Sequence, residues 1–86
     1  MAISFTEENY LKVIHRLSEA TSEDISTNAV AELMQTKAAS VTDMLRKLAD
    51  KGWVNYQKYQ GVRLSATGEK IALSIVRKHR LWEVFL

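Results

Sequence analysis

His79 and Glu83 are spaced so that they could bind one metal ion together. They lie four residues apart in a segment whose pattern predicts a helix, so both side chains project from the same side. An imidazole nitrogen and a carboxylate oxygen are suitable ligands for Fe²⁺ or Mn²⁺, which accept mixed nitrogen and oxygen donors. Two ligands do not complete a site, however, and a surface hydrogen bond is the commoner arrangement for such a pair. From these residues alone both interpretations stay open.

A second group of side chains could contact nucleic acid. They lie on a helix predicted over about residues 37–51, whose apolar residues share one side: Val41, Met44, Leu45 and Leu48. The opposite side carries small, hydroxyl and charged residues: Thr36, Ala39, Thr42, Asp43, Arg46 and Lys47. Small residues permit close approach to a DNA groove, hydroxyls bond phosphates or bases, and basic side chains attract the backbone. The exposed side of an ordinary helix has the same composition. The elements around this helix must therefore show whether it contacts DNA or only solvent.

Asp43 is the awkward member of this group, because a carboxylate repels phosphate. It could accept a hydrogen bond from a cytosine amino group and so discriminate between sequences. Pairing with Arg46 or Lys47 on the protein surface is the interpretation we favour.

The elements around this helix predict a winged helix-turn-helix. A short apolar-patterned segment (Ile25, Val30, Leu33) comes first and is followed by a polar turn at Gln35-Thr36. After the helix and Gly52 come two short alternating runs, residues 53–58 and 62–65, joined by a turn that holds Gly61. A helix, a turn, a second helix and a two-stranded ribbon usually present the second helix to the DNA major groove. The expected fold is therefore mainly α with a small β-hairpin wing.

The wing carries Lys58 and Arg63 on either side of its turn. Basic hairpins of this kind commonly follow the sugar–phosphate backbone or the minor groove. The alternative is that the two charges only keep an edge strand from pairing with another chain.

Two further helices enclose this unit. Ser4 and Glu7 have the spacing of a capping box, and a helix that ends near Ala20 should follow. One side of this helix carries the apolar residues Tyr10, Val13, Ile14 and Leu17. His15 lies beside them, and we expect it to have a structural role. A last helix is expected from about Ser65–Thr67 to Leu86. Its end is apolar on all sides (Leu81, Trp82, Val84, Phe85, Leu86), so it must be buried in a dimer or against a further domain.

Composition narrows the function classes. Eighty-six residues suit one domain, 47% hydrophobic and 26% charged content is ordinary for a globular protein, and there is no cysteine. We expect no membrane span and no secretory signal, so a cytoplasmic location is the default. Residues 1–32 hold two basic and six acidic side chains, a balance of −4, whereas residues 33–86 hold ten basic and four acidic, a balance of +6. That asymmetry favours a phosphate-facing surface in the second part.

Taken together, the motifs resemble the N-terminal half of the diphtheria toxin repressor family of metal-dependent repressors. Five strings carry the resemblance: Glu8-Asn9-Tyr10-Leu11, Ala31-Glu32-Leu33, Ser40-Val41-Thr42, Leu64-Ser65-Ala66-Thr67-Gly68, and the most specific, residues 77–86. The resemblance implies a dimeric repressor that binds palindromic operators with Fe²⁺ or Mn²⁺ as corepressor. It also implies that residues 1–64 form the DNA-binding domain. Residues 65–86 would then lead into a dimerisation domain that is absent from this chain.

The resemblance also implies particular site residues. DNA contacts would fall on Thr27, Asn28, Lys37, Ala39, Ser40, Thr42 and Asp43, and metal ligation by His79 and Glu83 becomes the favoured interpretation. The chain departs from the family on the first helix. Asn9 stands where the family places a methionine or aspartate ligand, and Lys12 stands where manganese-type members place a second carboxylate. An asparagine carbonyl is a weaker donor, and a cation should repel a second metal ion.

Three alternatives were compared with this one. An enzyme is disfavoured because the sequence has no glycine-rich phosphate loop, no His-Glu-x-x-His pair and no nucleophile with a recognisable base. A metal-independent winged-helix regulator is suggested by Asn9 and Lys12. A winged helix used for protein binding also stays open, because fold does not fix function.

Overall fold

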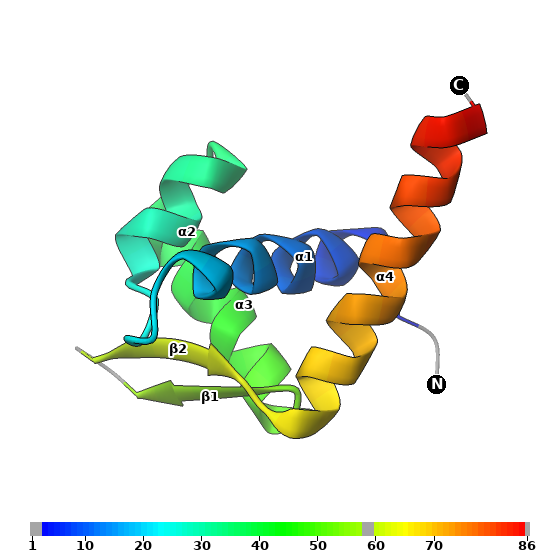
Figure 1. Cartoon of the computed structure of the whole chain (residues 1–86). Helices are drawn as coiled ribbons and strands as arrows, with labels where there is room; N and C mark the ends of the chain where they lie inside the picture. The colour runs from blue at the N-terminus through cyan, green and yellow to red at the C-terminus, as the bar shows by residue number, and fades with distance from the viewer. Residues whose placement is uncertain (1–2, 58–59, 86) are drawn as a thin grey trace.

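The structure is a computed structural model that describes residues 3–57 and 60–85, with side-chain surroundings given as far as Lys78. Its element order is α1 (Phe5–Ala20), α2 (Thr27–Met34), α3 (Ala38–Asp50), β1 (Val54–Gln57), β2 (Gly61–Leu64) and α4 (Ala66–Phe85). The helices pack around a shared core with the two-stranded wing at one end (Figure 1). The predicted winged helix-turn-helix is confirmed.

Local hydrogen bonds explain where the helices begin and end. Ser4 and Glu7 form the predicted capping box of α1, with N–H to oxygen distances of 3.1 Å in both directions. The Ser26 hydroxyl caps α2 by accepting from the Ala29 N–H. Gln35 ends α2 in the left-handed conformation, with φ 54°, which brings the chain sharply into α3. Gly52 has φ 78° after α3, as the left-handed cap predicted there requires.

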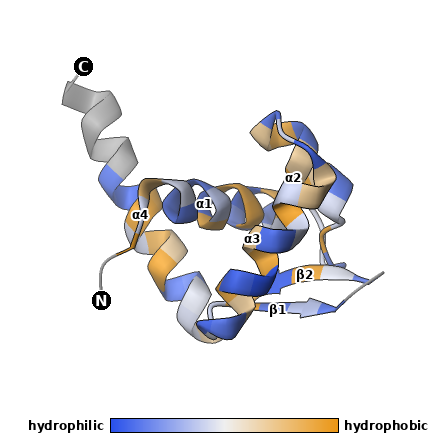
Figure 2. Ribbon diagram, turned by 180° about the vertical axis from the view of Figure 1, so that it is seen from behind, coloured by the Kyte–Doolittle hydropathy of each residue, from blue (hydrophilic) through white to orange (hydrophobic). Residues whose placement is uncertain are grey.

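The core is formed by one side of each helix and by the inner side of the wing. Its largest fully buried side chains come from α1, α2, α3 and β2: Leu11, Ile14, Val30, Val41, Leu45, Leu48 and Val62. Hydrophobic and hydrophilic residues alternate around α1, α3 and α4 in Figure 2, as expected for helices with one buried side. The first part of α4 joins the same core through Ala72 and Ile75.

One residue of the apolar pattern around α2, Leu33, is placed differently from the prediction. Leu33 is 47% exposed, and Ala31 is buried in its stead. Ile25 precedes the helix and forms an isolated antiparallel bridge with Val62 of β2, through N–H to oxygen distances of 2.9 and 2.8 Å. This bridge fastens the chain just before α2 to the wing.

Gly61 is the first residue of β2 and pairs with Gln57, so it belongs to the strand and not to the turn. Its φ is 118°, and a β-carbon there would press against the Ile25 carbonyl group. Gly68, in the first turn of α4, lies directly over the Trp53 carbonyl group, where a β-carbon would overlap the oxygen. The Ser65 hydroxyl completes this junction by accepting from the Gly68 N–H and donating to the Gly52 carbonyl.

Candidate DNA-binding surface and metal ligands

The side of α3 that faces away from the core has the residues expected of it. Ala39, Asp43, Arg46 and Lys47 are exposed, whereas Val41, Leu45 and Leu48 are fully buried beneath them. Met44, predicted with the core set, is half-buried against the same cluster. The interior of the domain therefore fixes which side of α3 is free to meet a partner.

The start of α3 lies beside the end of α2. Thr36, Lys37 and Ser40 border a shallow hollow of about 660 Å³ together with residues of α2. Lys37 is the N-cap of α3 and makes no side-chain capping hydrogen bond, so no side chain covers the first backbone N–H groups of the helix. These N–H groups form the positive end of the helix dipole, where negatively charged groups are favoured.

The side chain of Thr42 makes a hydrogen bond within the protein, whereas that of Asp43 makes no ion pair in the described part of the chain. The Thr42 hydroxyl donates to the Ala38 carbonyl one turn earlier at 3.1 Å, which leaves its lone pairs available. Asp43 forms no ion pair with Arg46 or Lys47 within the ranges 3–57 and 60–85. The surface pairing that we favoured for this carboxylate is therefore wrong, because neither basic side chain reaches it.

The start of α2 borders a second, smaller hollow next to the wing. Thr27 and Asn28 line this space of about 150 Å³ with Ser26, Gln60 and Gly61. Asn28 is exposed and Thr27 is half-buried. Residues of α2 line both hollows. This short helix therefore lies between the start of α3 on one side and the wing on the other.

Of the two basic residues predicted for the wing, the structure describes Arg63. Arg63 donates a hydrogen bond to the Ser22 carbonyl, and its Nε lies 3.7 Å from a carboxylate oxygen of Asp24. The guanidinium group is thus directed to the loop that precedes α2. Lys58 lies outside the described residues.

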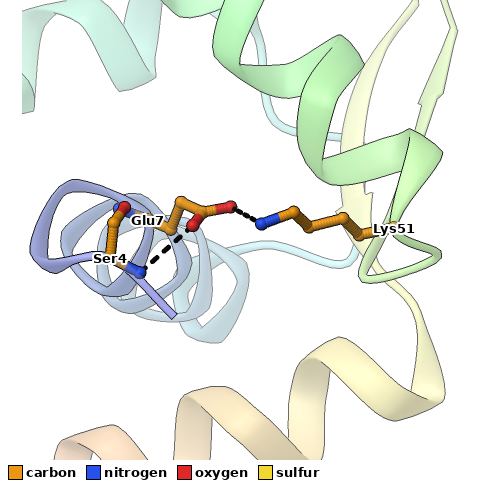
Figure 3. Close-up of polar contacts among 3 residues, drawn as sticks. All are labelled: Ser4, Glu7 and Lys51. Carbon is orange, nitrogen blue, oxygen red and sulfur yellow. Dashed lines mark hydrogen bonds and ion pairs between the residues drawn. The ribbon is translucent and has the colours of Figure 1, made fainter. Parts of the chain in front are cut away.

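A buried ion pair holds the far end of α3 against α1. Glu7 is only 4% exposed, and its carboxylate accepts from the Ser4 N–H and from the Lys51 ammonium group (Figure 3). Burial raises the pKa of Glu7, but the bonds from Lys51 and Ser4 outweigh it, and the pKa lies below its ordinary value of 4.5. Lys51 also lies 4.8 Å from the centre of the Trp53 ring. Sequence reasoning assigned Glu7 only to helix capping, because its partner is 44 residues away.

The candidate metal ligands are only partly described. Asn9 is half-buried on α1, one turn before the half-buried Lys12. His79 and Glu83 belong to α4, but their side chains lie outside the described residues. In the part of the chain with described side chains, no three His, Cys, Asp or Glu residues form a group that could hold a metal ion.

The donors therefore fit one metal ion better than two. One neutral oxygen from Asn9, with His79 and Glu83, is a chemically acceptable set for a single divalent ion. The resemblance places a second carboxylate at the position of Lys12 in manganese-type members, and an ammonium group at that position would repel a second ion. His15, expected to be structural, directs its Nδ1 to the Glu19 carboxylate at 3.1 Å within the same helix.

Comparison with known proteins identifies the family. Residues 3–62 match the model of the iron dependent repressor, N-terminal DNA binding domain. The chain belongs to this family. That result confirms the resemblance drawn from the five sequence strings, and it agrees with the expectation of a regulator and not an enzyme.

Individual relatives show the same likeness. The chain is 35% identical over 79 residues to the HTH-type transcriptional regulator MntR of Oceanobacillus iheyensis, covering 92% of this chain and 53% of that protein. The crystal structure of the metal-dependent transcriptional regulator MtsR superposes with a TM-score of 0.80 at 37% identity, over 91% of this chain. The manganese regulator SloR gives a TM-score of 0.76 at 44% identity, over 92% of this chain. The chain spans 36% of each of these two solved chains, so the relatives are considerably longer.

Proposed function

We propose that this protein is a DNA-binding transcriptional repressor activated by Fe²⁺ or Mn²⁺, which controls metal-uptake genes. The observation that carries the proposal is the exposed side of α3, which displays Arg46 and Lys47 in a fold shared with metal-dependent regulators. The proposed DNA contacts extend from this side to the neighbouring elements: Thr27, Asn28, Thr36, Lys37, Ala39, Ser40, Thr42, Asp43 and Lys58. Arg63, whose guanidinium group bonds to Ser22 and lies near Asp24, is assigned instead to anchoring the wing. The protein would act in the cytoplasm on a palindromic operator.

The chemistry of each contact follows from its position. The uncapped N–H groups at the start of α3, beside Lys37, suit a backbone phosphate. Ala39 and Ser40 permit close approach to base edges, and Arg46 and Lys47 add attraction to the phosphates that flank the groove. Asp43, which has no ion pair in the described part of the chain, is free to accept from a cytosine amino group. We therefore expect Asp43 to contribute to sequence preference and the basic residues to contribute to affinity.

Metal and dimer formation complete the proposal. His79, Glu83 and the carbonyl of Asn9 would hold one divalent ion between α4 and α1, which pack against each other. A bound ion would supply positive charge that fixes these two helices relative to one another. Residues 65–86 would lead into a dimerisation domain, and a homodimer would place two α3 helices one helical turn of DNA apart. In the described residues, no helix has the length and apolar character needed to cross a membrane.

Fluorescence anisotropy tests the proposal directly. A labelled duplex from the protein's own promoter region would be titrated with the protein in Mn²⁺, in anaerobic Fe²⁺ and in chelator, beside a scrambled duplex. We expect metal to tighten specific binding at least tenfold, which corresponds to about 1.4 kcal/mol of coupling. No preference for the promoter duplex under any metal condition would refute the repressor.

Variants on α3 test the surface itself. Replacing Arg46 or Lys47 with alanine should weaken binding to all sequences and lower the slope of log affinity against log salt by about 0.9 each. Arg16→Ala on α1 is the matched control, because Arg16 is exposed and outside the proposed surface. Unchanged affinity in both α3 variants would remove this side of α3 from the DNA interface.

A metal-independent regulator is the second candidate. The presence of Asn9 and Lys12 on α1 favours it, because the resemblance places a methionine or aspartate ligand at the first position and, in manganese-type members, a carboxylate at the second. Specific binding that is equal in metal and in chelator would support this candidate. A third possibility, a protein-binding module, predicts association that is insensitive to salt, whereas DNA binding weakens steeply as salt rises.

A further inference from the structure

The loop that joins α1 to α2 is attached to the wing immediately before the proposed DNA contacts of α2. Figure 1 shows this loop reaching the wing beside β2. Ile25 and Val62 exchange two backbone hydrogen bonds, with N–H to oxygen distances of 2.9 and 2.8 Å. Ser26, the next residue along the chain, is the N-cap of α2. The start of α2 is therefore one residue away from its attachment to β2.

Arg63 adds side-chain contacts to this backbone attachment. One step from the bridge along each segment, Asp24 lies opposite Arg63 in the antiparallel register. The Arg63 guanidinium group donates to the Ser22 carbonyl, and its Nε lies 3.7 Å from a carboxylate oxygen of Asp24. A guanidinium group presents several N–H donors in a fixed planar fork, so it can hold two acceptors at once. Arg63 thus joins β2 to two residues of the loop.

These contacts hold the orientation of the loop more than they stabilise the fold. The side chains of Arg63 and Asp24 are 43% and 42% exposed, and an ion pair so open to water contributes little to folding. Closeness of the two segments is already ensured at Gly61, where a β-carbon would lie 2.5 Å from the Ile25 carbonyl oxygen. A bridge at one residue still permits the loop to rotate about it. The guanidinium group supplies a second point of attachment, which opposes that rotation.

The hollow between α2 and the wing shows what this attachment positions. The start of α2 contributes Thr27 and Asn28 to its lining, and both are proposed DNA contacts. The wing contributes Gln60 and Gly61 to the same hollow. Arg63 does not line the hollow, so any effect that it has on these residues passes through the loop and β2.

We propose that Arg63 is a positioning residue for DNA recognition, which fixes the start of α2 relative to the wing through Ser22 and Asp24. The proposal rests on the DNA-binding function proposed above. Contacts to base edges require the reading residues to be in register with the DNA, whereas attraction to the phosphates carries no sequence information. Loss of Arg63 should therefore reduce the preference for the correct sequence and leave the affinity for other DNA nearly unchanged.

Anisotropy titrations of the 86-residue chain with the promoter duplex and with the scrambled duplex give the ratio of the two affinities. Arg63→Ala should lower this ratio about fivefold, which corresponds to about 1 kcal/mol, without changing the slope of log affinity against log salt. Partial unfolding would weaken binding to both duplexes equally and leave the ratio as it was. Arg16→Ala, which removes an exposed arginine from α1, is the matched control and should not change the ratio.

Removal of Asp24 gives the sharpest test, because two roles of Arg63 predict opposite results. If Arg63 contacts phosphate, Asp24→Ala removes a competing carboxylate and should strengthen binding to both duplexes. If Arg63 positions the loop, the same change should lower the affinity ratio, by about twofold to threefold because the bond to Ser22 remains. Glu23→Ala is the matched control: it removes an equal charge from the neighbouring exposed residue and should leave the ratio unchanged.

Hydrogen exchange tests the attachment without DNA. The N–H groups of Ile25 and Val62 both donate across the bridge, so their exchange rates report how often it opens. Arg63→Ala should raise both rates about fivefold or more relative to the rate of Leu45, which is fully buried in α3 and reports on the domain as a whole. Arg16→Ala should leave these relative rates unchanged.

Three results would overturn the proposal. The affinity ratio could be unchanged in Arg63→Ala, or Asp24→Ala could strengthen binding to both duplexes. Alternatively, the relative exchange rates of Ile25 and Val62 could be the same with and without Arg63. Equal binding of both duplexes by the wild-type chain would refute the proposed function itself, and with it the role of Arg63 in recognition. In that case the exchange rates would still show whether Arg63 holds the loop, so the two failures can be told apart.

Discussion

Replacing Lys51 with methionine should destabilise the domain strongly, because it leaves the buried Glu7 carboxylate without its ammonium partner. The side chain of Glu7 is 5% exposed and that of Lys51 is 26% exposed, so the pair is largely but not wholly removed from water. Loss of one partner from a fully buried pair costs about 3–5 kcal/mol. Partial solvent access at Lys51 lowers this value, and we expect a loss of about 2–3 kcal/mol.

Urea unfolding followed by tryptophan fluorescence measures this loss, since Trp53 lies next to Lys51. For a domain of this size the change corresponds to a fall in Tm of about 8–24 °C. Lys47→Met is the matched control. Lys47 is exposed in the last turn of α3, the helix that Lys51 follows as its C-cap residue, and replacement of Lys47 should change the free energy of unfolding by less than about 0.5 kcal/mol. Equal effects of the two substitutions would refute the buried pair.

A double variant separates the lost pair from general damage. Glu7→Gln keeps an oxygen that can accept from the Ser4 N–H but removes the buried charge. The double variant Glu7→Gln/Lys51→Met should therefore be more stable than Lys51→Met alone, with a coupling of about 1–2 kcal/mol. Additive effects in this cycle would show that the two side chains act independently.

The pH dependence of stability gives the same pair a second test. The pKa of Glu7 is lowered in the folded protein, so its contribution is fully present above the ordinary value of 4.5. It is lost as the pH falls through the lowered folded-state pKa. In Lys51→Met the carboxyl group is protonated at higher pH, because burial raises its pKa and the ammonium group is gone. The difference in unfolding free energy between wild type and variant should therefore narrow as the pH falls from the raised pKa of the variant's carboxyl group through the lowered pKa of Glu7 in the wild type. A difference that stays constant with pH would contradict the assignment.

Close backbone approaches and the anchoring of the wing give the remaining predictions. Gly68→Ala should cost about 3 kcal/mol or more by calorimetry, because its β-carbon would overlap the Trp53 carbonyl oxygen; a loss under 1 kcal/mol would contradict that approach. Gln35→Gly should raise the free energy of unfolding by about 0.5–1 kcal/mol, since glycine relieves the positive φ of 54°, and a clear loss would exclude strain there. Arg63→Ala should lower stability by about 1 kcal/mol but leave the salt slope of DNA binding unchanged, because the guanidinium group is held by Ser22 and Asp24. A slope reduced by about 0.9 would instead make Arg63 a phosphate contact.

Most of the fold could be predicted because its determinants are local. The capping box at Ser4 and Glu7 lies within one helical turn, and the periodic apolar residues Val41, Leu45 and Leu48 define the buried side of α3 over about two turns. Gly52, with its positive φ, marks the end of α3 as the sequence indicates. Each of these features depends on residues a few positions apart, so a single sequence is sufficient to detect them.

Local sequence patterns do not predict which of two apolar residues in α2 is buried. In α2 both Ala31 and Leu33 fit an apolar pattern, and the larger residue was the natural choice for the core. The structure buries Ala31 and leaves Leu33 exposed. An eight-residue helix has little more than two turns, and its rotation is therefore set by its neighbours and not by its own periodicity.

Part of the candidate site could be predicted from local sequence patterns and part could not. The exposed side of α3 could be predicted because it is the complement of a periodic buried side. The roles of Asp43 and Arg63 could not, because they depend on whether a side chain reaches a particular partner. Arg63 reaches Ser22, 41 residues earlier, whereas Asp43 reaches neither of the basic residues beside it in sequence.

The wing and the start of α2 are joined by contacts that no local pattern contains. The Ile25–Val62 bridge, the close approach of Gly61 to Ile25 and the bonds of Arg63 to the preceding loop all act on the same few residues. Three attachments between two short segments leave them little freedom to move separately. The proposed contacts at Thr27 and Asn28 should consequently keep a fixed position relative to the wing, so that a change which loosens the wing also displaces the start of α2.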